Sequence, residues 1–381
     1  MSSDASQSGG GPLQELRQKL IEHAHFLRGR GGNRLDMRDQ EMTRLVIDRF
    51  KFDLAWFGNC LFSFSSFSGA SFVEAKLTNT AFVHCNLANC DFSKAELRGI
   101  SIHHSNVAAS KLSQVRGAEA IVTFDQDGEY RIDFKRNSQT RMSTDFSNSD
   151  FRGADLTGAK LRGGVFRDAN LQGAVMEKAD LEGCDMSGAN LIGVNFSGAN
   201  VKEVKLEGAA FSLDDATRKI FAGNKDFEIF ANHQQALQDA LKDHETWALS
   251  GGMTGTKADF RGQSIKGGDF RYRTLAAMDF SDTTLRACQF NEAVLAAANF
   301  AGARISYCSF DQVDARGIKM SDADIKFSSF VDADLSQLAI QGRAQGVAAN
   351  LFGTLFTSCN MTGAKITADH LREARFVSCK R

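Results

Sequence analysis

The sequence of 381 residues contains a single proline, Pro12, and no apolar stretch of about 20 residues that could form a membrane helix. It also lacks the basic start and short apolar core of a secretory signal peptide. Lysine and arginine total 45 against 46 acidic residues, so the formal net charge of −1 provides no strong field of either sign. Because proteins that bind nucleic acid usually carry excess positive charge, we expect a cytoplasmic protein with no direct binding of nucleic acid.

The motifs of common enzyme and metal sites are missing as well. The sequence has no glycine-rich phosphate loop, no G-x-S-x-G, no H-E-x-x-H and no C-x-x-C pair. Its many aspartates recur at regular intervals, which indicates structural or solvated side chains rather than paired catalytic carboxylates. We therefore expect no enzymatic activity, no cofactor and no metal.

What the sequence has instead is a repeat of five residues, clearest between Asp145 and Phe211. A large apolar residue stands at every fifth position from Phe146 to Phe211, and the residue two places before it is usually small. Aspartate or asparagine often lies between these two residues, and glycine often follows two places after the large one.

A period of five fits neither an α-helix nor a flat strand. On a helix, residues five apart lie roughly 140° away from one another, so no apolar stripe forms. On a flat strand, an odd step moves the side chain to the opposite face. If the chain turns once per five residues, every large residue points inward, the polar residue points outward, and glycine occupies the turn. The sequence therefore predicts a narrow solenoid that stacks apolar side chains inside its coils.

Two segments resemble the A-(D/N)-L-x-x motif of the pentapeptide-repeat family. They are Arg152–Gly164 (RGADLTGAKLRGG) and Ser187–Val201 (SGANLIGVNFSGANV). The resemblance implies an all-β solenoid, a right-handed quadrilateral β-helix with four pentapeptides in each coil. It also implies a role in protein–protein interaction. Some family members instead mimic B-DNA and act on DNA gyrase or topoisomerase, which requires a strongly acidic surface.

The repeat runs divide the chain into two units, each with an N-terminal helical cap. Large central residues recur from Met37 to Leu112, from Phe146 to Phe211, and from Phe260 onward. The predicted parts are a disordered tail (1–11), a helical cap (12–33), a first solenoid (34–213) with an insertion at about 113–145, a helical linker and cap (214–250), and a second solenoid (251–381). We expect a phase slip of one residue at Gln341–Asn350.

Both predicted caps carry the same side chains at the same spacing. Leu16, Leu20, His23 and Phe26 correspond to Leu237, Leu241, His244 and Trp247. Because an open solenoid end would expose its core, we expect each helix to cover the first coil after it. We expect His23 and His244 to form hydrogen bonds with a backbone end of that coil rather than to bind a ligand.

The cysteines follow the repeat. Seven of the eight stand at the small inward position, and Cys379 has the same phase, so we expect buried thiols in a reducing compartment. Cys288 and Cys308 are twenty residues apart, as are Cys359 and Cys379, so a disulfide or metal between stacked thiols stays an open alternative.

Two segments are candidates for contacts with other proteins. Ile121–Phe134 alternates in polarity around Asp127-Gly128 and predicts a β-hairpin followed by a basic loop. The candidate interaction residues are Asp125, Asp127, Tyr130, Arg131, Lys135, Arg136 and Arg141. The C-terminal segment Thr367–Phe376 fits either a short capping helix or a further repeat. If that end is uncapped, the residues that would pair two chains as a homodimer are Leu371, Phe376 and Val377.

Two functions follow as hypotheses. The first is a non-enzymatic scaffold that binds protein partners. The alternative is a DNA mimic that modulates gyrase or topoisomerase. Acidic and basic residues are mixed along both predicted solenoids, which favours the scaffold.

Overall fold

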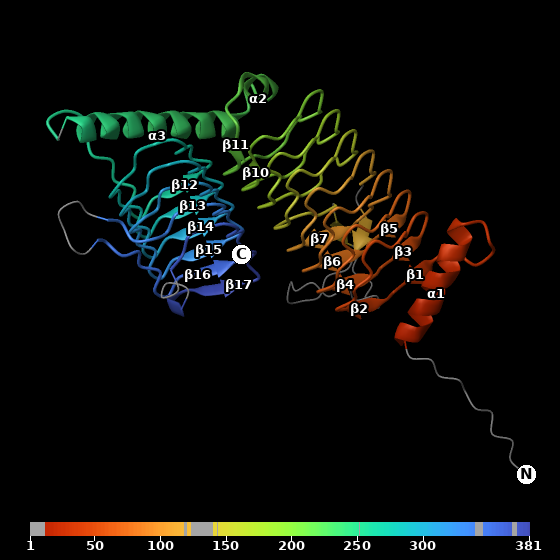
Figure 1. Cartoon of the computed structure of the whole chain (residues 1–381). Coiled ribbons are helices and arrows are strands. Elements are labelled where there is room, and N and C mark those ends of the chain that lie inside the picture. The colour runs from red at the N-terminus through yellow and green to blue at the C-terminus, as the bar shows by residue number, and fades with distance from the viewer. Residues whose placement is uncertain are drawn as a thin grey trace, which may run out of the picture. The chain divides into compact units, whose positions relative to one another are not determined.

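The computed structural model describes residues 12–117, 120–122, 140–142, 144–250, 252–339, 346–367 and 372–381 (Figure 1). The chain divides into two compact units. The first comprises Met1–Glu207 with Asp214–Phe221, and the second comprises Gly208–Leu213 with Ala222–Arg381. The predicted tail at 1–11 lies outside the described residues.

The first unit is a parallel β-solenoid that follows helix α1 (Pro12–Leu27). One sheet contains β1 (Asp36–Arg38), β3 (Trp56–Gly58) and β5 (Lys76–Thr78), and each residue pairs with the residue twenty positions later. A second sheet contains β2 (Glu41–Thr43), β4 (Leu61–Ser63), β6 (Ala81–Val83) and β7 (Ser101–His103). A spacing of twenty residues means four pentapeptides in each coil, which confirms the predicted repeat.

Isolated parallel bridges continue the ladders where the strands are too short to be named, as between Asp155 and Val175. The remaining short strands of the chain's middle are β10 (Asn190–Leu191) and β11 (Ala210–Phe211). Helix α2 (Asp215–Ile220) begins at Asp214, whose carboxylate accepts a hydrogen bond of 2.8 Å from the Thr217 amide. Asp214 is therefore the N-cap of this helix.

The second unit contains helix α3 (Lys225–Leu249) and a six-stranded parallel sheet. The strands are β12 (Ser264–Lys266), β13 (Thr284–Arg286), β14 (Arg304–Ser306), β15 (Asp324–Lys326), β16 (Leu355–Thr357) and β17 (Arg375–Val377). Figure 1 shows α3 as the long helix beside the first coils of this unit. Leu237 and Leu241 join the unit's apolar core there.

The interior of both units is filled by large side chains from successive coils. In the second unit the rings of Phe270, Phe290, Phe310 and Phe330 stack with centroids 4.5 to 4.8 Å apart. Each of these rings has 0% exposure. Stacked rings at the distance between strands bury almost all their surface, so the inward positions form a continuous apolar core.

Each corner of the coil requires a left-handed backbone. The residue two places after the central one has φ between about +50° and +72°, for example +62° at Gly153. Glycine adopts this conformation without strain, which explains its frequency there. Asparagine and aspartate also tolerate it, as at Asn59 (φ 53°).

The predicted insertion is present, but the hairpin differs from the prediction. Ser101 pairs with Asp145, forty-four positions later, so the coil continues after the insertion. Strands β8 (Ala120–Val122) and β9 (Thr140–Met142) are antiparallel, and Ile121 pairs with Arg141. A tight turn at Asp127-Gly128 would have paired Ile121 with Phe134. The predicted partner of Ile121 is therefore wrong, whereas the turn predicted at Asp127-Gly128 lies outside the described residues.

A second insertion explains the phase slip. Lys319 pairs with Asn350, thirty-one residues later, so eleven residues leave the coil between them. Leu338 and Val347 exchange two backbone hydrogen bonds of 2.8 Å at the base of this excursion. Eleven is two pentapeptides plus one, which produces the predicted slip of one residue. Ile340, read in the sequence as a central repeat residue, lies outside the described part.

The last coil decides in part whether Thr367–Phe376 forms a capping helix or a further repeat. Phe376 lies on β17, which pairs in parallel with β16, so the repeat continues there. Residues 368–371 lie outside the described part, and Leu371 is among them.

Candidate interaction surfaces

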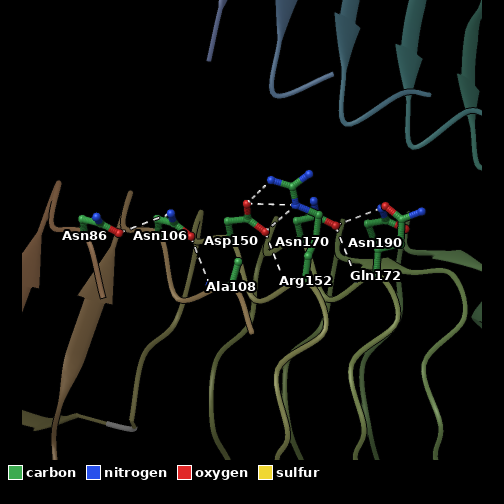
Figure 2. A network of polar contacts seen from close by, with 8 residues as sticks. All are labelled: Asn86, Asn106, Ala108, Asp150, Arg152, Asn170, Gln172 and Asn190. Atoms are coloured by element: carbon green, nitrogen blue, oxygen red, sulfur yellow. Dashed lines mark hydrogen bonds and ion pairs between the residues drawn. The ribbon is translucent and has the colours of Figure 1, made fainter. Parts of the chain in front are cut away.

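The repeat fixes which side chains can meet a partner. The residues directly before and after each central residue point outward, and equivalent positions in successive coils form columns along the sheets. One such column holds Asn86, Asn106, Asp150, Asn170 and Asn190 (Figure 2). Asn170 and Asn190 are only 1% exposed, so an outward position is not always accessible to a partner. Because the columns are set by backbone ladders, the outer groups stand at fixed spacings of about 4.8 Å.

The contacts of this column are mainly structural. The Asn106 Nδ2 donates to the Asn86 Oδ1 at 3.3 Å, and the Asn190 Nδ2 donates to the Asn170 Oδ1 at 3.0 Å. Asn106 and Asn170 also accept hydrogen bonds from backbone amides two residues later (Figure 2). These Asx turns use the side chains to hold each corner. The prediction that the regular acids and amides satisfy local backbone groups is confirmed at these positions.

The aspartate in this column accepts the backbone amide of Arg152 at 3.1 Å and makes an ion pair as well. The Arg152 guanidinium lies 2.6 Å from the Asp150 carboxylate, on the same pentapeptide. The Arg152 side chain is about half exposed, so the pair contributes little to stability.

A corner of the first unit gathers aromatic and histidine side chains. The rings of Phe64, His84 and His104 stack along the solenoid with centroids 5.0 and 5.1 Å apart. Beside them the His103 Nε2 lies 3.1 Å from the Asp145 Oδ2. Burial lowers the pKa of His104, and the neighbouring imidazoles lower it further. Hydrogen bonds from His103 and from Ser147 hold the pKa of Asp145 below its usual value despite burial, which acts to raise it.

The two cap histidines have the role that the sequence predicts. The Leu35 amide donates to the His23 Nδ1 at 3.0 Å, and the Ala258 amide donates to the His244 Nδ1 at 3.3 Å. Leu35 and Ala258 both stand two places before the first central residue of a unit. Burial lowers the pKa of both histidines, so the neutral imidazole is the form that fits.

The cysteines have the expected place in the core. Seven thiols are buried, and Cys379 is half-buried. Burial raises the pKa of Cys60 and Cys85 to about 11 and of Cys184 to about 12. The Cys288 amide donates to the Cys308 Sγ at 3.3 Å, so these two residues stack as predicted, and both are free thiols.

The described residues offer no other recognisable chemical site. Within them, no group of three or more His, Cys, Asp or Glu side chains is placed to hold a metal ion. No helix of the described part is long and apolar enough to cross a membrane.

Most of the predicted interaction residues cannot be placed. Asp125, Asp127, Tyr130, Arg131, Lys135 and Arg136 lie outside the described residues, and only the backbone of Arg141 is described, in β9. At the C-terminal end, Phe376 stacks on Phe356 at 4.9 Å, and the Arg381 guanidinium lies 4.2 Å from the Phe376 ring centroid. Val377 is 43% exposed.

The chain was compared with known proteins. The family model "Pentapeptide repeats" matches in eight copies, over residues 70–107, 143–168, 169–208, 279–317 and 298–337. No curated protein matches the chain.

Solved structures of repeat proteins are similar at low identity. A pentapeptide repeat protein of the Arabidopsis thaliana thylakoid lumen is 27% identical over 29% of this chain and 72% of its own, with a TM-score of 0.21. HetL of the cyanobacterium Nostoc, involved in heterocyst differentiation regulation, is 16% identical over 98% of this chain and 95% of its own, with a TM-score of 0.18. Trypsin-treated QnrB1, a plasmid-mediated fluoroquinolone resistance protein, is 14% identical over 53% and 97%, with a TM-score of 0.29.

Superpositions this weak carry no functional inference, but the family match agrees with the repeat in the sequence and with the coils of the structure. The chain belongs to the pentapeptide-repeat family.

Proposed function

We propose that this protein is a non-enzymatic scaffold that binds other proteins on the outer faces of its solenoid units. One observation carries the proposal. The inward positions of the coils are filled by apolar side chains with almost no exposure, such as Phe151, Leu161 and Phe166 at 0%. An active site needs a concave, partly desolvated pocket, whereas a filled coil leaves its polar groups on flat outer faces. We also propose that the coils are right-handed, as the resemblance to the family implies.

The proposed setting is the cytoplasm. All eight cysteines are free, including the stacked pair Cys288 and Cys308. Disulfides are rare where glutathione and thioredoxin keep thiols reduced, so unpaired stacked cysteines support a reducing compartment.

We propose the insertion as the first contact element, on the basis of its sequence. The test replaces Asp125–Arg141 with a short Gly/Ser linker and compares affinity capture from the native cell lysate with that of the intact protein. A control variant receives the same linker in place of Gln341–Gln345. We expect a specific protein partner with the intact chain and the control, and its loss with the first replacement. A failure to capture any specific protein would contradict the scaffold proposal.

Pairing of two copies through the C-terminal coil is a second, separate proposal. Strand β17 is the last in the order of its sheet, and its final residue Val377 is exposed. An edge strand with an apolar side chain can pair with another chain. Light scattering should show a dimer that becomes a monomer with Val377→Asp, whereas Ser378→Asp, one residue away at the corner, should have a smaller effect. A monomeric intact protein would disprove this pairing.

A further inference from the structure

One outer face of the first unit differs from the others in charge. The sheet β1–β3–β5 is continued by parallel bridges from Lys76 through Glu96, Arg116 and Lys160. We use the term basic face for the outward residues of this sheet from Trp56 to Arg162. Its five bases are Lys76, Arg98, Arg116, Lys160 and Arg162. Its only described acid is Glu96. In a chain with a net charge of −1, this is a local concentration of positive charge.

Two cations at the centre of this face stand side by side, between the acids Glu96 and Asp180 of the neighbouring strands. Arg116 and Lys160 are direct neighbours on adjacent strands, and both side chains are exposed. Neither forms an ion pair with any described residue. Like charges directly opposite each other on a sheet destabilise it. The backbone keeps them there through hydrogen bonds from the Arg116 amide to the Ala95 carbonyl (3.0 Å) and from the Lys160 amide to the Val115 carbonyl (2.9 Å).

The flanking bases are only partly neutralised. The Arg98 Nη1 lies 4.0 Å from the Glu96 carboxylate. The Arg162 guanidinium lies 2.6 Å from the Glu182 carboxylate and 3.8 Å from that of Asp180. The side chains of Arg98 and Arg162 are 55% and 60% exposed. Ion pairs this exposed are weak and exchange readily, so an incoming carboxylate can compete for both guanidinium groups.

Trp56 marks one end of the face. The Arg34 guanidinium carbon lies 3.6 Å from its ring centroid, and the Lys76 Nζ lies 4.8 Å from it. These cation–π contacts hold Lys76 and one further positive group, Arg34, beside the indole. They also occupy the ring, so Trp56 is not a free platform on which a nucleic-acid base could stack.

We propose that the basic face binds a short acidic segment of a partner protein. Trp56 and Lys160 are separated by four steps between neighbouring strands, a distance of about 19 Å. An extended peptide of about six residues spans this distance. The next residues along the sheet are Asp180 and Glu182, which limit the positive strip at that end. A strip of this length, bounded by acids and lacking a stacking platform, suits a compact acidic peptide better than a continuing phosphate backbone.

The location fits the scaffold proposal, on which this inference rests. The insertion leaves the coil after Gly117, directly beyond Arg116. A partner held by the insertion would therefore meet the basic face.

The test uses the full chain and a fluorescein-labelled peptide of twelve glutamates, with binding followed by fluorescence anisotropy at 50 and 300 mM NaCl. We expect Arg116→Glu with Lys160→Glu to weaken binding at least tenfold. The same pair changed to glutamine should give an intermediate loss, and keeps the test valid if charge reversal impairs folding. The control is Lys51→Glu with Lys111→Glu, which makes the same change of net charge on a different face and should leave binding within twofold.

Three results would overturn the inference: no binding of the peptide at 50 mM NaCl, an equal loss in both reversal variants, or tighter binding of single-stranded DNA of equal charge at the same residues. Its failure is distinguishable from failure of the scaffold proposal. A protein partner captured equally by the intact chain and by the Arg116→Glu, Lys160→Glu variant would contradict only the basic face, whereas the absence of any partner would contradict the scaffold.

Discussion

The two cap histidines show how one atom can close the end of a solenoid. The first backbone amide of each unit has no preceding coil whose carbonyl could accept its hydrogen bond. A buried amide without an acceptor costs free energy. The Nδ1 of His23 and of His244 provides that acceptor. Only an imidazole with an unprotonated Nδ1 can accept, which connects this contact to pH.

We predict that the stability of the first unit depends on His23 at mildly acidic pH. Burial lowers the folded-state pKa of His23 below the unfolded value of about 6.5. The unfolded chain therefore binds the proton more readily, so this part of the stability is fully present above about pH 6.5. It declines as the pH falls toward the folded pKa. Denaturant midpoints of the wild type and variants at pH 8 and pH 5.5 measure the effect.

Two substitutions distinguish the loss of the hydrogen-bond acceptor from the effect of protonating the imidazole. His23→Asn retains a side-chain oxygen near the position of Nδ1, so it should flatten this pH dependence while keeping much of the stability at pH 8. His23→Phe leaves the Leu35 amide without its acceptor and should cost about 1–3 kcal/mol at pH 8. The cost should be smaller at pH 5.5, where the wild type has already lost part of this stability. Identical pH profiles for the wild type and His23→Asn would refute the role of the imidazole.

The thiols provide a second prediction for single residues. Because burial raises the pKa of Cys90 and Cys184 to about 12, these thiols stay protonated and unreactive near pH 8. Ellman's reagent should titrate only the half-buried Cys379 in the native protein, and all eight thiols after denaturation. A Cys379→Ser variant should lose the native signal. Fast modification of several thiols in the native state would show that the coils open or are packed differently.

At the scale of single elements, helix α3 illustrates a cap that also satisfies the backbone. Leu241 is 1% exposed and belongs to the apolar core of the second unit. The Gln234 Nε2 donates to the Lys266 carbonyl at 2.7 Å, and the Gln238 Nε2 donates to the Asp269 carbonyl at 2.8 Å. The helix thus covers the apolar end and supplies donors for carbonyls of the first coil.

We predict that Leu241→Ala destabilises the second unit by about 2–4 kcal/mol, because it leaves a cavity between helix and coil. Leu249→Ala on the same helix changes a side chain that is 90% exposed and should cost less than about 0.5 kcal/mol. Denaturant unfolding followed by Trp247 fluorescence in a Trp56→Phe background reports on this helix. Equal midpoints for the two alanine variants would show that α3 does not cap the core.

The elements that could be predicted from sequence are those with a period. The five-residue repeat places each central residue inside, and the matching spacing around His23 and His244 identifies both caps. The pairing of Ile121 with Arg141 could not be predicted, because the alternating polarity around Asp127-Gly128 favours a nearer partner. The residues that share an outer face were also missed. A comparison of every twentieth residue aligns Lys76 with Arg116, but Lys160 joins them only once the insertion length is known.

At the scale of the molecule, each unit combines an apolar, filled interior with four outer faces that carry different side chains. One turn of the first unit presents Arg98, His103, Ala108 and Ser113, each directly after a central residue on a different face. These four positions have the same local backbone and differ in what surrounds them. They therefore allow the faces to be compared within a single coil.

Site-specific photo-cross-linking in the native cell tests most directly whether one outer face binds a protein partner. A photoreactive residue is placed at each of these four positions in turn. We expect the photoreactive residue at position 98, on the basic face, to capture a specific protein partner with an acidic segment, and those at positions 108 and 113 to capture none. Capture at similar efficiency from all four faces, or from none, would contradict the claim that this solenoid is a scaffold with one dedicated binding face.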